Sequence, residues 1–247
     1  MPSSGSPSLI RRFGAVHRWV GLLGLVGLFG STAARAQHGD HAASFPTSLA
    51  TLAEGAAIIS DLGVWHREVV ASAEAQAYFD QGLRLVYGFN HDEAARSFAK
   101  AAVLSPGCAM CFWGIALSLG PNYNVPMQPD RAKLAWDALK KARSLASRPI
   151  DKALVGALSD RYAGPELPAD QSRYDAAYAD AMRKVAASDA ADVDVQVLFA
   201  EALMDVRPWR LWTAEGAPAP DTLELVATLE RALLASPSHP GACIRAR

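Results

Sequence analysis

A spacing of small and aromatic residues in the first half of the chain restricts its fold more than any other feature. The positions concerned are Tyr78, Gly82, Ala94, Phe98, Ala101 and Pro106. Small side chains let two antiparallel helices approach closely, and a proline cannot continue the helix before it. Phe112 lies 34 residues after Tyr78, so the pattern starts again there. Units that recur at this period bury their apolar faces by stacking on one another.

This spacing matches the tetratricopeptide (TPR) signature, a helix–turn–helix unit of about 34 residues. Three strings, FNHDEA (89–94), CAMCFWGIA (108–116) and GPNYN (120–124), resemble a family of exported bacterial TPR proteins. The likeness extends over roughly residues 60–243. It implies an all-α fold, an α-α superhelix of about four TPR-like hairpins, occupying residues 49–243.

Loops rich in glycine and proline separate the other expected helices of the domain. An N-terminal segment at 49–70 precedes the repeats, and GPNYNVPMQPD (120–130) is expected to be an ordered loop. Further helices are expected at 149–162, 170–187, 193–206 and 221–235. Asn90, Ser105 and Asp221 stand where they would cap helix N-termini, and Gly88 is a helix stop.

Residues 1–36 have the pattern of a secretory signal peptide. Arginines precede a short apolar run, and Ala34-Arg35-Ala36 then provides a small-x-small cleavage site. We therefore expect export to the periplasm or beyond, followed by a flexible lead-in at 37–48. The apolar run is too short to span a bilayer, so no membrane span is expected after cleavage. Removal of four arginines takes the formal net charge from −1 to −5, which disfavours nucleic acid as a partner.

A stacked helical array of this kind offers a concave face lined by the first helix of each pair. The residues expected on it are Phe79, Leu83, Tyr87, Met110, Trp113 and Leu117. They predict an aromatic groove for an extended peptide or a helix. The alternative is that the segment 49–70 or the next turn covers these side chains, which would then be core residues.

Cys108 and Cys111 form a C-x2-C motif at the start of an expected helix. In an exported protein the pair is compatible with packing, with a local disulfide, or with a soft metal such as Cu(I). A single C-x2-C motif is a weak metal signal, and Phe112 in the next position excludes covalent c-type haem. No cofactor is expected.

Two features near the C-terminus stand out. In RPWRLW (207–212), two tryptophans lie near two arginines, either packed under a loop or forming an exposed binding edge. The last expected helix has leucines on more than one face, which predicts an uncovered apolar surface and self-association. Members of the family that this chain resembles continue beyond HPGAC into further repeats. We therefore interpret residues 244–247 as a tail that does not belong to the family pattern, and the absence of the further repeats as a truncation.

The sequence contains no nucleophile elbow, phosphate loop or paired carboxylates at a catalytic spacing. We therefore expect a non-catalytic TPR scaffold of the cell envelope that binds a protein or peptide. The alternative is a periplasmic soft-metal-binding or thiol-redox protein that uses Cys108 and Cys111.

Overall fold

The structure is a computed structural model that describes residues 45–246. The expected signal peptide and most of the expected lead-in lie outside these residues. The helices are α1 (Leu49–Ala53), α2 (Ala73–Tyr87), α3 (His91–Leu104), α4 (Ala109–Leu119), α5 (Pro129–Leu145), α6 (Pro149–Ser159), α7 (Ser172–Ser188), α8 (Val193–Val206), α9 (Thr222–Ala235) and α10 (Pro240–Arg245). The only extended pairing within 45–246 is an isolated bridge between Trp212 and Pro218. The all-α prediction is therefore confirmed for the part of the chain that the structure describes.

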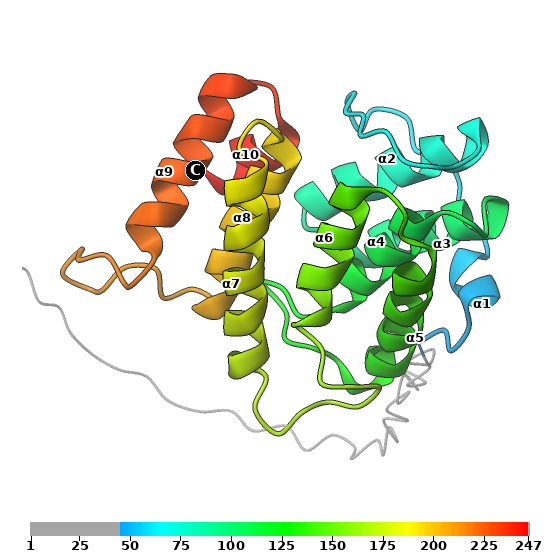
Figure 1. Ribbon diagram of the computed structural model, residues 1–247, viewed down its shortest axis with the longest axis horizontal. Coiled ribbons are helices and arrows are strands. Elements are labelled where there is room, and N and C mark those ends of the chain that lie inside the picture. Colours follow the sequence, from blue (N-terminus) through cyan, green and yellow to red (C-terminus); the bar gives the residue numbers. More distant parts are fainter. Residues whose placement is uncertain (1–44, 247) are drawn as a thin grey trace, which may run out of the picture. The chain divides into compact units, whose positions relative to one another are not determined.

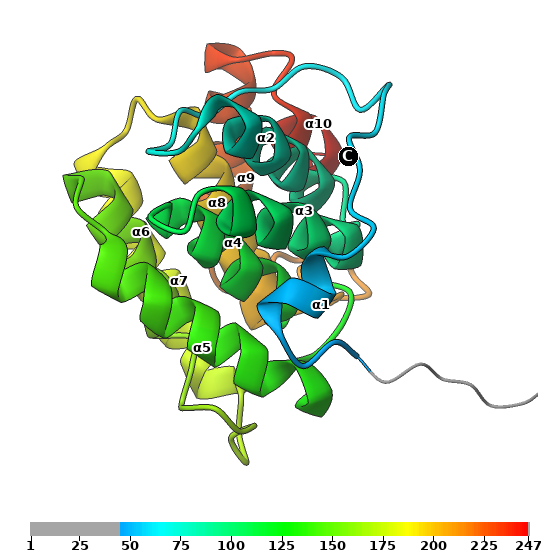
Figure 2. The same ribbon diagram turned by 90° about the vertical axis from the view of Figure 1, so that its right-hand side faces the viewer.

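Helices that follow one another along the chain pack side by side. From α2 to α10 each helix contacts the next, and α4 also packs against α2 and α6. Figures 1 and 2 show this succession, with α7, α8 and α9 lying next to one another. No helix within residues 45–246 has the length and apolar character that crossing a membrane requires.

Most helix boundaries follow from capping residues. Asn90 caps α3, since its side chain accepts a hydrogen bond from the backbone N–H of Glu93, and Gly88 ends α2. Ser105 instead ends α3, because the turn continues to Cys108, which is the residue that caps α4. Asp221 has a left-handed backbone and makes no side-chain cap, because its carboxylate binds Arg183 and Arg207. The prediction that Ser105 caps a helix N-terminus is therefore wrong, whereas Asp221 is the N-terminal cap residue of α9 as predicted but without a side-chain hydrogen bond to the helix.

The ring of Phe98 on α3 explains why glycine stands at two of the helix contacts. A Cβ atom added at Gly82 on α2 would lie 2.8 Å from this ring, and one added at Gly114 on α4 would lie 2.5 Å from it. Real Cβ atoms do not approach so closely. The two glycines therefore create the space for one fully buried aromatic side chain between three helices.

The start and the end of the described unit meet at Asp194, in the first turn of α8. Its carboxylate accepts hydrogen bonds from Trp65 Nε1 at 2.9 Å, from the Tyr87 hydroxyl and from His239 Nε2 at 3.0 Å. Arg67 lies 3.1 Å from the same carboxylate. Helix α10 packs on α2, α8 and α9. The array thus does not remain open, because its last helix returns to its second one.

Candidate functional site

The six residues expected to line a concave groove are in the hydrophobic core. Phe79, Leu83, Tyr87, Met110, Trp113 and Leu117 are all buried, and none is more than 7% exposed. They therefore line no open face in this structure. The prediction of a groove at these positions is corrected, and the alternative interpretation, that they are core residues, is what the structure shows.

Tyr87 illustrates the reason for this correction. Its ring lies 4.9 Å from that of His239, centroid to centroid, and a Cβ added at Gly241 would meet it at 2.6 Å. Its hydroxyl reaches Asp194 on α8. Residues of α8 and α10 therefore cover Tyr87, which the repeat pattern alone predicts to be open. Periodicity cannot show this, because the covering residues lie more than 100 positions later in the chain.

Cys108 and Cys111 form a disulfide bond at the start of α4, and both side chains are fully buried. Of the three interpretations of this motif, the structure shows the local disulfide. The bonded sulfurs are not free thiolates, which are the form that binds soft metals. Within residues 45–246, no three His, Cys, Asp or Glu side chains are grouped so as to hold a metal ion.

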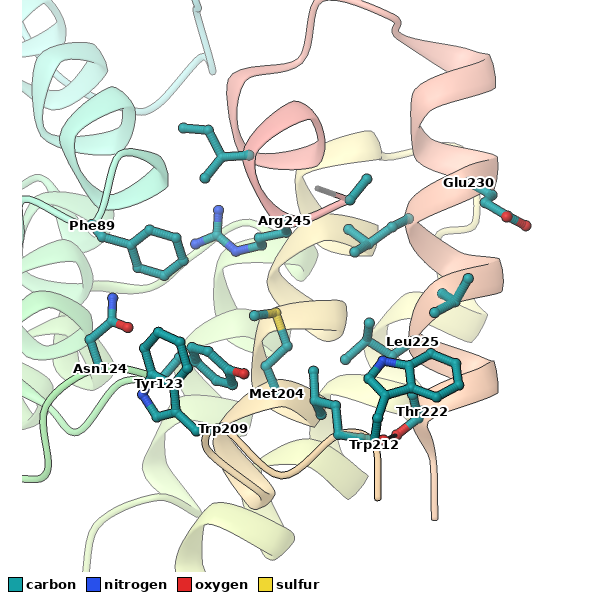
Figure 3. A pocket seen from close by; sticks show the side chains of 15 residues that line it. Phe89, Tyr123, Asn124, Met204, Trp209, Trp212, Thr222, Leu225, Glu230 and Arg245 are labelled. Carbon is teal, nitrogen blue, oxygen red and sulfur yellow. Dashed lines mark hydrogen bonds between the residues drawn. The ribbon is translucent and has the colours of Figure 1, made fainter. Parts of the chain in front are cut away.

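A cavity of about 720 Å³ opens where the helical array ends, between α9 and the loops that follow α2 and α4 (Figure 3). We call it the terminal groove. Its lining is mainly aromatic and aliphatic. The residues that line it are Phe89, Tyr123, Asn124, Met204, Trp209, Leu211, Trp212, Thr222, Leu225, Val226, Leu229, Glu230, Ile244, Arg245 and Ala246.

One wall of the terminal groove is an aromatic pair. The rings of Tyr123 and Trp209 lie 5.0 Å apart, centroid to centroid, and Phe89 lies on the same side of the groove in Figure 3. Trp209 has a left-handed backbone with φ of 60° and is 73% exposed. Exposed aromatic side chains in a concave surface are typical of binding sites.

The opposite wall is the apolar side of α9, which carries Leu225, Val226 and Leu229. Trp212 lies near this wall and is 51% exposed. It stands in the loop from Arg207 to Pro220, which Arg207 ties to α9 by hydrogen bonds to the Pro220 carbonyl and to Asp221. The exposed-edge interpretation of the RPWRLW string is thus the one that the structure supports for its two tryptophans.

The apolar surface expected on α9 is smaller than predicted, because only some of its leucines are exposed. Leu225 and Leu229 are buried, whereas Leu223 is 63% and Leu234 84% exposed. Helix α10 follows and packs on α9, and Ile244 in the expected tail extends the terminal groove. Self-association through this surface stays a prediction.

Charged side chains form a buried layer beneath the loop 120–128. Arg161, at the end of α6, lies 2.6 Å from Asp205 and 3.4 Å from Asp175. Arg245 lies 2.7 Å from Glu201. All five residues are buried. Neither Asp205 nor Asp175 stands out in the sequence; the available signal for Asp205 was a pair of carboxylates, at 201 and 205, in the mainly apolar second half of the helix 193–206.

This layer shifts the ionisation of its members. Burial raises the pKa of Asp205 to about 8, and the neighbouring Arg161 only partly offsets that effect. Burial also lowers the pKa of His91, which packs near Glu201 and Arg245, so its imidazole is neutral at pH 7. Neither ring nitrogen of His91 has a hydrogen-bond partner.

The chain was compared with protein families, curated proteins and solved structures. None of them matches it.

Proposed function

We propose that this chain is a non-catalytic scaffold of TPR-like hairpins, exported to the cell envelope, that binds a protein or peptide segment in the terminal groove. The observation that carries the proposal is the groove itself, about 720 Å³ in volume and walled by aromatic side chains on one side and by α9 on the other. Concave, mainly apolar surfaces with few polar groups are typical of ligand sites, and amphipathic helices dock into apolar grooves.

Two further observations support parts of the proposal. Antiparallel helix pairs with glycine and alanine at their contacts are the arrangement that a TPR-like superhelix requires. Export is supported by the pattern of residues 1–36, and a disulfide between Cys108 and Cys111 is compatible with an oxidising compartment.

The groove predicts a peptide with apolar anchors. Trp209 and Trp212 expose large flat surfaces. Aliphatic contacts come from Val226 on α9, which is partly exposed, and from Ile244 on α10. An amphipathic helix or an extended segment with two or three large apolar side chains matches this lining. The lining residues Arg245 and Glu230 add one charge of each sign, so a strongly charged segment has no matching surface in the groove.

A peptide-display selection against residues 37–247 tests this function. We expect enriched sequences with spaced aromatic or aliphatic residues, and we expect Trp212→Ala to weaken their binding at least tenfold, a loss of about 1.4 kcal/mol or more. The matched control is Val64→Ala, which removes an apolar side chain that is 96% exposed and lies outside the groove. Equal binding by the wild type and Trp212→Ala would overturn the proposal.

A further inference from the structure

Helix α10 is capped at its N-terminus by an imidazole ring. Pro240, the first residue of the helix, has no backbone N–H, so the first N–H groups of α10 belong to Gly241 and Ala242. Both donate hydrogen bonds to His239 Nδ1, at 3.1 and 3.2 Å. Nδ1 must therefore keep its lone pair free of a proton in order to cap the helix.

These bonds fix the protonation state of His239. Because Nδ1 accepts, the ring proton is on Nε2, which lies 3.0 Å from Asp194 Oδ1 and donates to it. A second proton has to go to Nδ1, where it would face the two backbone N–H groups. Three donors would then point at one another around a side chain that is fully buried, and buried donors without an acceptor are costly. The docked helix therefore requires the neutral imidazole.

The packing around the start of α10 prevents an adjustment in place. The side chains of Tyr87 and Val197 lie so close to Gly241 that a Cβ atom there would meet them at 2.6 and 2.8 Å. The His239 ring lies against the rings of Trp65 and Tyr87, with centroid distances of 4.2 and 4.9 Å. The two N–H groups cannot turn away from a protonated ring unless α10 is displaced from α2 and α8.

We propose that His239 is a proton-sensitive latch, which holds α10 on α2 and α8 while the imidazole is neutral and releases the helix when Nδ1 takes up a proton. Release gives all three N–H donors access to water. An imidazole in water has a pKa of about 6.5. By linkage, docking of α10 is unaffected well above this pH and weakens by up to about tenfold for each pH unit below it.

The charged groups that surround His239 keep their ionisation between about pH 7 and about pH 5. The pKa of Asp194 on α8 is lowered, so this carboxylate stays charged, and burial raises the pKa of Tyr87 on α2, which stays neutral. Arg67 binds both Asp194 and Asp192. The Asp194 carboxylate attracts an imidazolium ring, but it contacts the ring at Nε2 and provides no acceptor at Nδ1.

A competing sensor lies farther along the same helix. Arg245 of α10 pairs with Glu201 and lies over the Tyr87 ring, and His91 packs near Arg245 and Glu201. Burial lowers the pKa of His91, so its imidazole also charges only in acid. His91 does not bond to the backbone of α10, however, and its protonation leaves the cap of the helix intact.

Release of α10 has a consequence for the terminal groove, because Ile244, Arg245 and Ala246 line it. A segment bound there at neutral pH is then expected to be released in acid. This consequence rests on the proposed function. The latch itself is tested without any ligand, so its failure and the failure of the groove as a binding site are separate results.

Amide hydrogen exchange of residues 37–247 at about pH 7 and about pH 5 tests the latch. The amides of Cys243 and Ala246 bond to the carbonyls of His239 and Ala242 and report the docking of α10. After correction for the intrinsic exchange rate at each pH, we expect their protection factors to fall about 25-fold, the ratio for an imidazole that titrates at about pH 6.5 only after release. A fall of less than about threefold would overturn the proposal.

The protonation state is measured separately by ¹⁵N NMR of the histidine side chains at about pH 7. We expect His239 to carry its proton on Nε2, with Nδ1 unprotonated. This measurement uses the wild-type chain and does not depend on whether any variant folds. A proton on Nδ1 of the docked helix would contradict the latch directly.

Histidine variants locate the sensor. His239→Asn keeps a side-chain oxygen that accepts from helix N–H groups but takes up no proton in this range, so its α10 protection is expected to be independent of pH. His66→Asn is the matched control, because this exposed histidine contacts Asp80 and not α10. It should show the wild-type fall, and so should His91→Asn. Persistence of the fall in His239→Asn, or its loss in His91→Asn, would each overturn the assignment to His239.

Discussion

At the scale of single residues, glycines decide how closely the helices pack. Gly114→Ala would place a Cβ atom 2.5 Å from the Phe98 ring, which is fully buried and cannot move freely. We expect this change to lower the free energy of unfolding by about 1 to 3 kcal/mol, measured by urea denaturation.

The matched control for Gly114 is Gly156, inside α6. A Cβ atom added there meets nothing within 4 Å. Gly156→Ala is therefore expected to raise the free energy of unfolding by about 1 kcal/mol, because alanine favours the helix. If both substitutions change the stability equally, the contact with Phe98 is not what requires glycine at position 114.

Asp194 predicts an acid-sensitive contribution to stability. Hydrogen bonds from His239 and Tyr87 and the charge of Arg67 lower its pKa in spite of its burial. The unfolded chain has a pKa of about 3.9 at this group, so the contribution is present above that pH and is lost as the pH falls through the lower folded value. Asp194→Asn is expected to cost about 2 to 4 kcal/mol at pH 7 and to reduce the slope of stability against pH in the acid range.

Chemical denaturation from pH 7 to pH 3 measures both effects. Asp61→Asn is the control, since this exposed carboxylate accepts only one hydrogen bond, from the neighbouring Ser60. An Asp194→Asn variant with the stability of the wild type at pH 7 would contradict the role of Asp194 as the link between the two ends of the unit.

At the scale of single elements, the disulfide constrains only the first turn of α4. It joins residues three positions apart. A loop this short removes little entropy from the unfolded chain, so reduction is expected to lower the free energy of unfolding by no more than about 2 kcal/mol.

Because both sulfurs are buried and bonded to each other, Cys108 and Cys111 are expected to resist alkylation. We expect alkylation of the native protein to label only Cys243, which is partly exposed, and labelling of all three cysteines to require both reductant and denaturant. Mass spectrometry measures this directly. Labelling of Cys108 and Cys111 in the native protein without reductant would restore the thiol interpretation of the motif.

At the scale of the whole described unit, the return of α10 to α2 closes the array. Gly241 is the point of contact, because a Cβ atom there would lie 2.6 Å from Tyr87 and 2.8 Å from Val197. Gly241→Val is expected to displace α10, to lower the free energy of unfolding by about 2 to 4 kcal/mol, and to speed amide hydrogen exchange in α10 and at the C-terminal end of α2.

Gly164→Ala is the matched control for Gly241→Val, because an added Cβ atom meets nothing there. The control should keep wild-type exchange throughout. If Gly241→Val exchanges as slowly as the wild type, α10 is not what covers Tyr87.

Much of the secondary structure follows from local signals. The helix expected at 193–206 has those bounds, and the one expected at 221–235 begins one residue later, because these ends depend on neighbouring residues. The missing side-chain cap at Asp221 has a tertiary cause, since its carboxylate pairs with Arg183 and Arg207. The error at Ser105 is local, because the turn continues to Cys108 before α4 begins. The tryptophans of the terminal groove were visible in the sequence, but the other residues of its wall come from distant elements.

The sequence by itself determined the helical class, the positions of the helices and the small residues at their contacts, because these depend on spacing within one or two turns. Only the tertiary structure decided which face is open. Asp194 gathers Trp65, Tyr87 and His239 from three distant segments, and this contact covers Tyr87, which the spacing pattern alone predicts to be open. Burial is a property of what packs against a surface, and a pattern within one segment contains no information about a partner that arrives more than 100 residues later.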